Sequence, residues 1–160
     1  MSEYEPVAEA AFISDLEVLS TEECFALLVS SPIGRIAIVI DGQPLVFPVN
    51  FRLVARLDEE PVIVIRTRHA GLIAQGQTRC AFQCDAIDMH THTGWSVLVQ
   101  GTLRELNPIN PDVPHGWLDP EPWADEAERT KWLLIVPTAI TGRRLSASNA
   151  EWAFSVHAYL

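Results

Sequence analysis

The stretch GWSVLVQG, residues 94–101, decides the fold. Its odd positions hold a tryptophan and two valines, and its even positions hold a serine, a leucine and a glutamine. β-branched and aromatic residues at a period of two, bounded by glycines, predict a strand that is apolar on both faces. Such a strand lies inside a barrel or between packed layers. Two interpretations stay open: a central core strand, or one wall of a ligand slot with the Trp95 ring and the Ser96 hydroxyl at its mouth.

The length and composition of the chain predict one domain over residues 1–160. The chain is 48% hydrophobic and 20% charged, which suits a soluble protein with a single core of substantial size. No apolar run reaches the roughly 18 residues of a membrane span, and the acidic start lacks the features of a secretory signal. We therefore expect a cytoplasmic protein with no membrane partner. Three cysteines are too few for a disulfide framework.

The charges are unevenly distributed within a net charge of −10. Residues 1–23 hold seven acids and no Lys or Arg, whereas residues 34–104 hold seven arginines against six acids. An acidic chain argues against a nucleic-acid partner, which needs a basic stripe. An arginine-bearing centre within acidic flanks suits a small anion held inside the fold.

A helix is predicted after Ser20. Glu23, three residues later, completes a capping box, and Leu19 with Cys24 can form a hydrophobic staple. Pro32 marks the end of the helix. We expect Cys24 to be a small buried hydrophobic residue and not a nucleophile.

Strands are expected in quick succession along the rest of the chain, over residues 34–40, 45–51, 62–67, 79–88, 94–101 and 132–144. The pair Asp41-Gly42 predicts a hairpin between the first two. Pro48 has no amide hydrogen to donate, so its strand must be irregular or open along part of its length. Pro137 predicts a bend in the last strand. Residues 79–88 show no alternation clean enough to identify a solvent face.

Other segments are expected to lie outside the sheet. Residues 1–18 have no clear period and predict an arm along the surface or along a partner subunit. Residues 106–130 form an excursion rich in proline and acid. Short helices are expected over 70–76 and 121–130, and the C-terminal EWAFSV can dock.

No metal site is predicted. Six possible ligands lie close together in sequence: Cys80, Cys84, Asp85, Asp88, His90 and His92. Their spacing matches no zinc pattern such as paired CxxC or HExxH.

Five segments, taken in order, resemble the pyridoxamine 5′-phosphate oxidase-like FMN-binding split barrels, in the branch with a GWSVxVxG strand. They are GRIAIVIDGQPLVFPVNF, VIVIRT, FQCD, GWSVLVQG and IVPTAITGRRL, and the resemblance runs from Leu19 to Leu145. It implies an all-β chain with peripheral helices, folded as a six-stranded antiparallel split β-barrel. It also implies a homodimer with two cofactor sites at the subunit interface.

The same resemblance implies a set of FMN-binding residues. A valine and an asparagine in LVFPVNF would lie along the isoalloxazine edge, and the arginine and threonine of VIVIRT would meet the ribityl and phosphate groups. A tryptophan and a serine would enter from the central strand, and an arginine of the TGRR turn would stand near them. An arginine fork suits a phosphate, and hydroxyls and amides suit the ring. The implied residues are Val49, Asn50, Arg66, Thr67, Arg68, Leu72, Trp95, Ser96 and Arg143.

One departure from the family pattern concerns the phosphate. After the RT pair, this branch usually reads close to PGTKL, and its lysine helps hold the phosphate; here Leu72 occupies that position. The loss removes a charge-assisted contact of roughly 1.5–3 kcal/mol. Arg68 or His69 can compensate. Otherwise the chain binds flavin weakly, prefers a deazaflavin, or has lost its cofactor.

Two functions remain open. The first is a flavin-dependent oxidoreductase of unidentified small-molecule substrate, in which the flavin performs the electron transfer and no catalytic side chain stands out. The second is a non-catalytic flavin or deazaflavin carrier, or a cofactor-free dimeric module. Vitamin B6 oxidase activity is not favoured, because the residues that hold its substrate phosphate find no match here.

Overall fold

The computed structural model describes residues 16–56, 59–67, 77–106 and 131–146. Within these ranges the chain forms seven strands and one helix. In chain order they are β1 (Leu16–Leu19), α1 (Thr21–Val29), β2 (Ile33–Ile40), β3 (Gln43–Arg56), β4 (Glu59–Thr67), β5 (Gln77–Asp88), β6 (Thr93–Leu106) and β7 (Lys131–Leu145).

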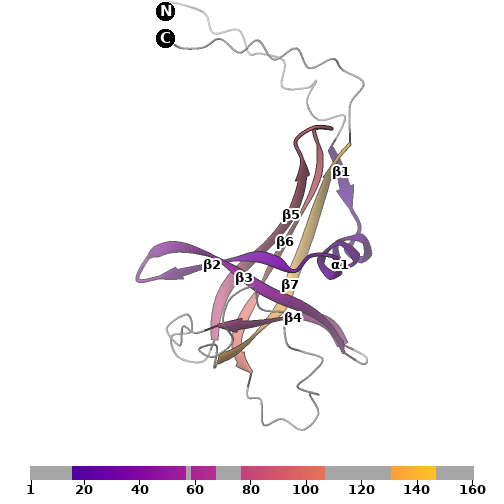
Figure 1. Ribbon diagram of the computed structural model, residues 1–160. Helices are drawn as coiled ribbons and strands as arrows, with labels where there is room; N and C mark the ends of the chain where they lie inside the picture. Colours follow the sequence, from indigo (N-terminus) through magenta and orange to yellow (C-terminus); the bar gives the residue numbers. More distant parts are fainter. Residues whose placement is uncertain (1–15, 57–58, 68–76, 107–130, 147–160) are drawn as a thin grey trace, which may run out of the picture.

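The strands close into a barrel. Their order is β1-β7-β4-β3-β2-β5-β6, β6 pairs back onto β7, and every pairing is antiparallel. Strands β2 to β7 therefore form the predicted six-stranded antiparallel split barrel, which is confirmed. β7 pairs with β4 through its first residues and with β1 through its last four, so β1 continues the sheet where β4 has left it. Figure 1 shows β5, β6 and β7 side by side, and the β2–β3 hairpin projecting from them.

The barrel interior is filled by alternating side chains of all six strands. Phe51 and Phe82 meet edge to face at its centre, with ring centroids 4.8 Å apart and planes at 67°. Gly34 lies directly beneath Phe82, where any Cβ would overlap the ring. Burying each large side chain contributes roughly 1.5–3 kcal/mol. Other core members are Ile36, Ile38, Ile63, Ile65, Val97, Val99, Leu103, Leu133 and Ile135.

The hairpin and the two proline irregularities are found where the sequence predicts them. Asp41 and Gly42 both have positive φ, 51° and 76°, as a tight two-residue hairpin requires. β3 pairs with β2 from Gln43 onward but meets β4 only from Phe51, so among the described strands the half of β3 around Pro48 has an open edge. The β6–β7 register shifts where Gly101 pairs with Pro137.

Two strand predictions are corrected. The strand expected over residues 62–67 begins earlier, because residues 59–61 already belong to β4. β5 does alternate: Cys80, Phe82 and Cys84 are buried in the core, while the residues between them are more exposed. The glutamine and aspartate at positions 83 and 85 face outward. The alternation could not be recognised in the sequence, because cysteines and alanines surround these two polar residues.

The predicted helix start is confirmed, and its packing ties the N-terminal part to β7. Glu23 N–H donates to Ser20 Oγ at 3.3 Å, and Ser20 N–H donates to Glu23 Oε2 at 2.9 Å. The Arg144 guanidinium then reaches Glu17 at 3.1 Å and Glu23 at 3.4 Å, which joins β1 and α1 to the end of β7. Because the hydrogen bonds from Ser20 favour its charged form, the pKa of Glu23 is lowered.

Several expected segments lie outside the described residues. They are residues 1–15 of the predicted arm, the short helices over 70–76 and 121–130, the excursion beyond Leu106, and the C-terminal tail. The arm enters the described part only at Leu16, where it becomes β1. No helix in the described ranges has the length and apolar character to cross a membrane.

A substitution at Gly142 tests how β1 and α1 dock onto β7. A Cβ there would lie 2.5 Å from Cys24 Sγ and 3.0 Å from Leu19 Cδ1. We predict that Gly142→Ala lowers the free energy of unfolding by roughly 1–3 kcal/mol, the usual cost of overpacking. Urea unfolding followed by circular dichroism measures it.

The matched background for this test is Cys24→Ala, which removes the sulfur atom that the new methyl group would meet. In that background Gly142→Ala should cost clearly less, because neighbouring substitutions are not additive. Equal costs in both backgrounds would show that the helix is not held against Gly142.

Candidate functional site

Two of the predicted residues, Asn50 and Arg66, lie together on the outer surface of the barrel. Phe51 of β3 pairs with Ile65 of β4, and both point into the core. Since successive residues of a strand point to opposite faces, Asn50 and Arg66 face outward, just beyond this pair. Asn50 is only 8% exposed, which makes it a buried polar group among the described residues. Val49, beside it, is half-buried and packs against the core.

Arg66 is held by a tryptophan that the sequence analysis missed. Trp132 of β7 is the register partner of Arg66, and the guanidinium lies over its ring, 5.1 Å from the centroid. A cation–π contact of this kind is worth about 0.5–2 kcal/mol. We call Val49, Asn50, Arg66 and Trp132 the Arg66 cluster. The side chain of Thr67, and Arg68 and Leu72 altogether, lie outside what the structure describes.

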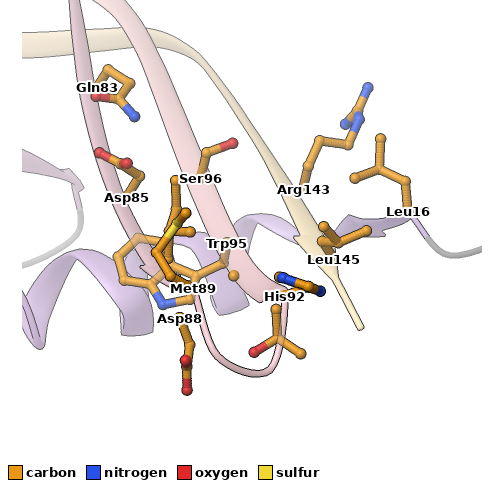
Figure 2. Close-up of a pocket in the computed structure, with 13 residues that line it drawn as sticks. Leu16, Gln83, Asp85, Asp88, Met89, His92, Trp95, Ser96, Arg143 and Leu145 are labelled. Atoms are coloured by element: carbon orange, nitrogen blue, oxygen red, sulfur yellow. The ribbon is translucent and has the colours of Figure 1, made fainter. Parts of the chain in front are cut away.

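A second group of predicted residues lines a pocket of about 300 Å³ at the other end of β7. Ser96 pairs with Arg143 on one side and with Asp85 on the other, so the three side chains form a row across β5, β6 and β7. Figure 2 shows Gln83 and Asp85 along one side of the pocket and Arg143 and Leu16 along the other, with Ser96 between them. We call Trp95, Ser96 and Arg143 the Ser96 cluster.

The interpretation of residues 94–101 as a core strand is confirmed, and the beginning of the strand also lines a pocket. Val97 and Val99 of β6 are completely buried in the barrel. Trp95 lies on the same side of the strand as these valines and packs against the core, while Ser96 faces outward; both nevertheless line the pocket. The strand is therefore a core strand whose first residues form one wall of a hollow.

The acids around the pocket are engaged by neighbouring groups. Arg35 of β2 contacts Asp85 at 2.7 Å and Gln83 at 3.2 Å. Arg143 differs, because its guanidinium donates to the carbonyl of Gly142 at 3.0 Å and forms no ion pair among the described residues. The guanidinium of Arg143 thus has no carboxylate partner among the described residues.

Asp88 organises the turn that forms the rim of the pocket. Its Oδ1 accepts from the amides of His90 at 2.8 Å and Thr91 at 3.2 Å. These bonds favour the carboxylate, so the pKa of Asp88 is lowered from its usual 3.8. The turn is completed by His92, whose φ is 52°.

The two clusters lie at opposite ends of β7. The Arg66 cluster contains Trp132 near the beginning of the strand, and the Ser96 cluster contains Arg143 near its end. At about 3.3 Å per residue these positions are up to roughly 35 Å apart. A ligand pocket of about 300–1,000 Å³ is only roughly 7–10 Å across. A pocket of that size does not span the full length of β7 between Trp132 and Arg143, while the pairings of β3 with β2, β2 with β5 and β5 with β6 place Asn50 three strands away from Ser96.

The cysteines offer no reactive thiol. Burial raises the pKa of Cys80 to about 11 and also raises the pKa of Cys24 and Cys84. Since the thiolate is the nucleophile and the metal ligand, these side chains act as core residues. Cys84 Sγ donates to the carbonyl of Ile33 at 3.3 Å. Within the described ranges, no three His, Cys, Asp or Glu side chains gather as a metal site.

A larger hollow, of about 710 Å³, opens further along the same outer face, where the β2–β3 hairpin leaves the sheet. Ala37, Ala81 and Gly101 line it together with one charged residue, Arg79. It includes none of the predicted site residues, so size alone does not identify the functional site.

Comparison with known proteins identifies relatives of the whole barrel. The profile of the pyridoxamine 5′-phosphate oxidase family matches residues 20–144. The FAD binding protein of Mycobacterium smegmatis, whose structure is solved, is 32% identical; the match covers 81% of this chain and 98% of that one, with a TM-score of 0.58. The uncharacterized protein Rv0080 of Mycobacterium tuberculosis is 28% identical over 139 residues, 82% of this chain and 86% of that protein.

A more distant relative shares the fold. It is the solved FAD-binding protein of Mesorhizobium loti, 23% identical, with a TM-score of 0.63. The match covers 82% of this chain and 99% of that one.

The Asp88 turn gives a pH-dependent prediction. A carboxyl group with a lowered pKa stabilises the folded turn at pH values above its usual 3.8, and that contribution is lost as the pH falls through the lowered value. We expect the amide resonances of His90 and Thr91 to titrate together with a midpoint below 3.8, measured by NMR. Asp88→Asn, which keeps an acceptor oxygen but cannot ionise, should abolish this titration. A midpoint at or above 3.8 would contradict the hydrogen bonds.

Proposed function

Because the chain belongs to the pyridoxamine 5′-phosphate oxidase family, we propose that it binds a flavin between two copies of itself and acts as a flavin-dependent oxidoreductase on a small molecule. The observation that carries this proposal is the separation of the Arg66 cluster from the Ser96 cluster. Residues that the family resemblance assigns to one cofactor fall into two groups, one beside the beginning of β7 and one at its end. A second copy that supplied one of the clusters would bring both kinds of residue to one cofactor.

Twofold symmetry provides that arrangement. In a twofold dimer, if one surface of the first copy contacts a second surface of its partner, the reverse contact also exists. The Arg66 cluster of each copy would then face the Ser96 cluster of the other, which gives two equivalent sites. The dimer would also cover the open edge of β3 around Pro48, which exposes unpaired backbone groups.

The side chains of the two clusters fit a flavin. Asn50 offers both a donor and an acceptor, which suits the polar edge of the ring system. Arg66 offers a fixed fork of N–H donors, which suits a phosphate. Ser96 adds a hydroxyl, and Trp95 and Arg143 line the pocket beside it. A bound flavin would supply the electron transfer, and the protein would bind and orient it.

The phosphate distinguishes the flavins from each other. The sequence resemblance favours FMN, the similar protein of Mycobacterium smegmatis binds FAD, and riboflavin has no phosphate. Arg66 can meet a phosphate in FMN or FAD. If Leu72 weakens the phosphate site, a deazaflavin or a carrier role without catalysis becomes the competing function. An absorption spectrum of the purified protein, which shows whether flavin bands are present, separates these possibilities.

The phosphate contact is tested by titrating FMN and riboflavin into single variants. Arg66→Ala should weaken FMN binding by at least ~1.5 kcal/mol, about tenfold, and should affect riboflavin much less. Trp132→Leu should produce a smaller loss in the same direction, because it removes the ring over which the guanidinium lies. Flavin fluorescence gives both affinities.

Arg52→Ala is the matched control for this titration, because it removes an arginine from the exposed face of the same β3 strand that carries Asn50. It should leave the ratio of FMN to riboflavin affinity unchanged. If Arg66→Ala lowered the affinities for FMN and riboflavin equally, the assignment of Arg66 to the phosphate would be contradicted.

Mixing two variants, each weakened in flavin binding, tests whether each site is shared between copies. Arg66→Ala damages the first cluster, and Ser96→Tyr fills the second with a ring. A mixed dimer would combine both defects in one site and leave the other site intact. After random exchange of subunits, about half of the dimers are mixed, so about a quarter of all sites should bind flavin.

The outcomes of mixing are distinct. Recovery of binding above the sum of the separate variants supports sites shared between copies. If mixing restores no flavin binding although the two variants exchange subunits, the two clusters do not serve one shared site. Light scattering that finds only monomers at micromolar concentration would also count against the proposal.

A further inference from the structure

We propose that the pocket beside the Ser96 cluster binds a small amphipathic anion, with an apolar body against Trp95 and Leu145 and a single anionic group on Arg143. This inference rests on the proposed function only in naming the anion as the substrate that meets the flavin. The inference that an anion binds rests on the residues that line the pocket, and it is tested on protein without any cofactor.

The apolar part of the argument is the exposure of large side chains around the pocket. Leu16 is 46% exposed, Ile87 68%, Met89 75% and Leu145 43%, and all four line the same hollow. They come from β1, β5, the turn after β5, and β7. Contiguous exposed apolar groups that surround a concavity mark a binding site more often than a free surface. Covering them gains roughly 25 cal/mol for each Å² removed from water.

The charged part of the argument is the guanidinium of Arg143. Asp85 is paired with Arg35, and Asp88 accepts the amides of its own turn. Arg143 forms no ion pair within the described ranges and retains free guanidinium donors. Asp88 keeps its negative charge at the rim of the pocket, and Arg143, which has no carboxylate partner among the described residues, is the lining group that can bind an anion. A carboxylate or a sulfonate suits its fork.

The geometry limits the ligand to a small molecule. The pocket volume of about 300 Å³ lies at the lower end of the range for ligand sites. Ser96 and Arg143 are register partners, so the hydroxyl and the guanidinium lie on neighbouring strands. Figure 2 shows Arg143 beside Leu16 and above Leu145, so that the charged and apolar walls are adjacent. A ligand with its anionic group at one end of an apolar body matches this order.

The test uses two fluorescent probes that differ by one charge. Anilinonaphthalene sulfonate is an aromatic anion, and phenylnaphthylamine has nearly the same rings without the sulfonate. The flavin-free protein should bind the sulfonate more tightly. Arg143→Gln should reduce sulfonate affinity about tenfold or more and leave the neutral probe unchanged. Arg143→Lys should retain part of the preference.

Two further variants locate the binding. Arg79→Gln, which removes a matched exposed arginine from the larger hollow on the same face, should change neither probe. Met89→Asp, at the rim of the pocket, should weaken both. If Arg143→Gln lowers the affinity for both probes equally, or if Arg79→Gln has the same effect as Arg143→Gln, the proposal is overturned.

Adding the flavin separates this inference from the proposed function. If saturating FMN leaves sulfonate affinity unchanged or increases it, the pocket is a substrate site beside the flavin. If FMN displaces the sulfonate competitively, the pocket belongs to the flavin itself and the proposal is overturned. If the chain binds no flavin at all, the proposed function fails, while the preference for the anion and its dependence on Arg143 still decide whether the pocket binds anions.

Discussion

The structure depends on β7 pairing with three other strands at once. Its first residues pair with β4, its last residues pair with β1, and β6 runs along nearly its whole length. This sharing closes the barrel, because β4 and β6 meet the same strand from opposite sides. It also tilts the strands, as barrel closure requires. Following the ladders around the barrel therefore returns to β7 far from the starting residue, and this displacement separates the Arg66 cluster from the Ser96 cluster.

The arginines on the outer face fall into two kinds. Arg35 and Arg144 are paired with carboxylates of neighbouring elements and fasten β2 to β5 and β7 to α1. Exposed pairs of this kind contribute about 0–1 kcal/mol each, so they adjust the docking of elements more than they stabilise the barrel. Arg66 and Arg143 are held differently, by an aromatic ring and by a carbonyl oxygen. A guanidinium offers a fork of N–H donors, which suits an anionic ligand.

Local chemistry made much of the fold predictable, and non-local pairing limited the rest. The capping box at Ser20 and the hairpin at Gly42 depend on residues a few positions apart, and both are confirmed. Strand ends were predicted too short, because the outer face of a barrel tolerates charged residues that resemble a loop. The contact between Arg66 and Trp132 joins strands that are distant in sequence, so no local pattern indicates it. For the same reason the sequence could name candidate site residues but not reveal that they form two groups.

Sharing a site between two copies has a thermodynamic consequence. In the proposed dimer, a flavin that contacts both copies binds the dimer and not the separate subunits. By mass action it must then stabilise the dimer, and dilution of the protein must weaken its apparent affinity. The pocket beside Ser96 would be completed by the same association, because it lies next to residues that the partner would cover. Trp95 connects these events to folding, since it packs against the core on one side and lines the pocket on the other. The barrel must therefore be correctly packed before its surface can present either part of the site.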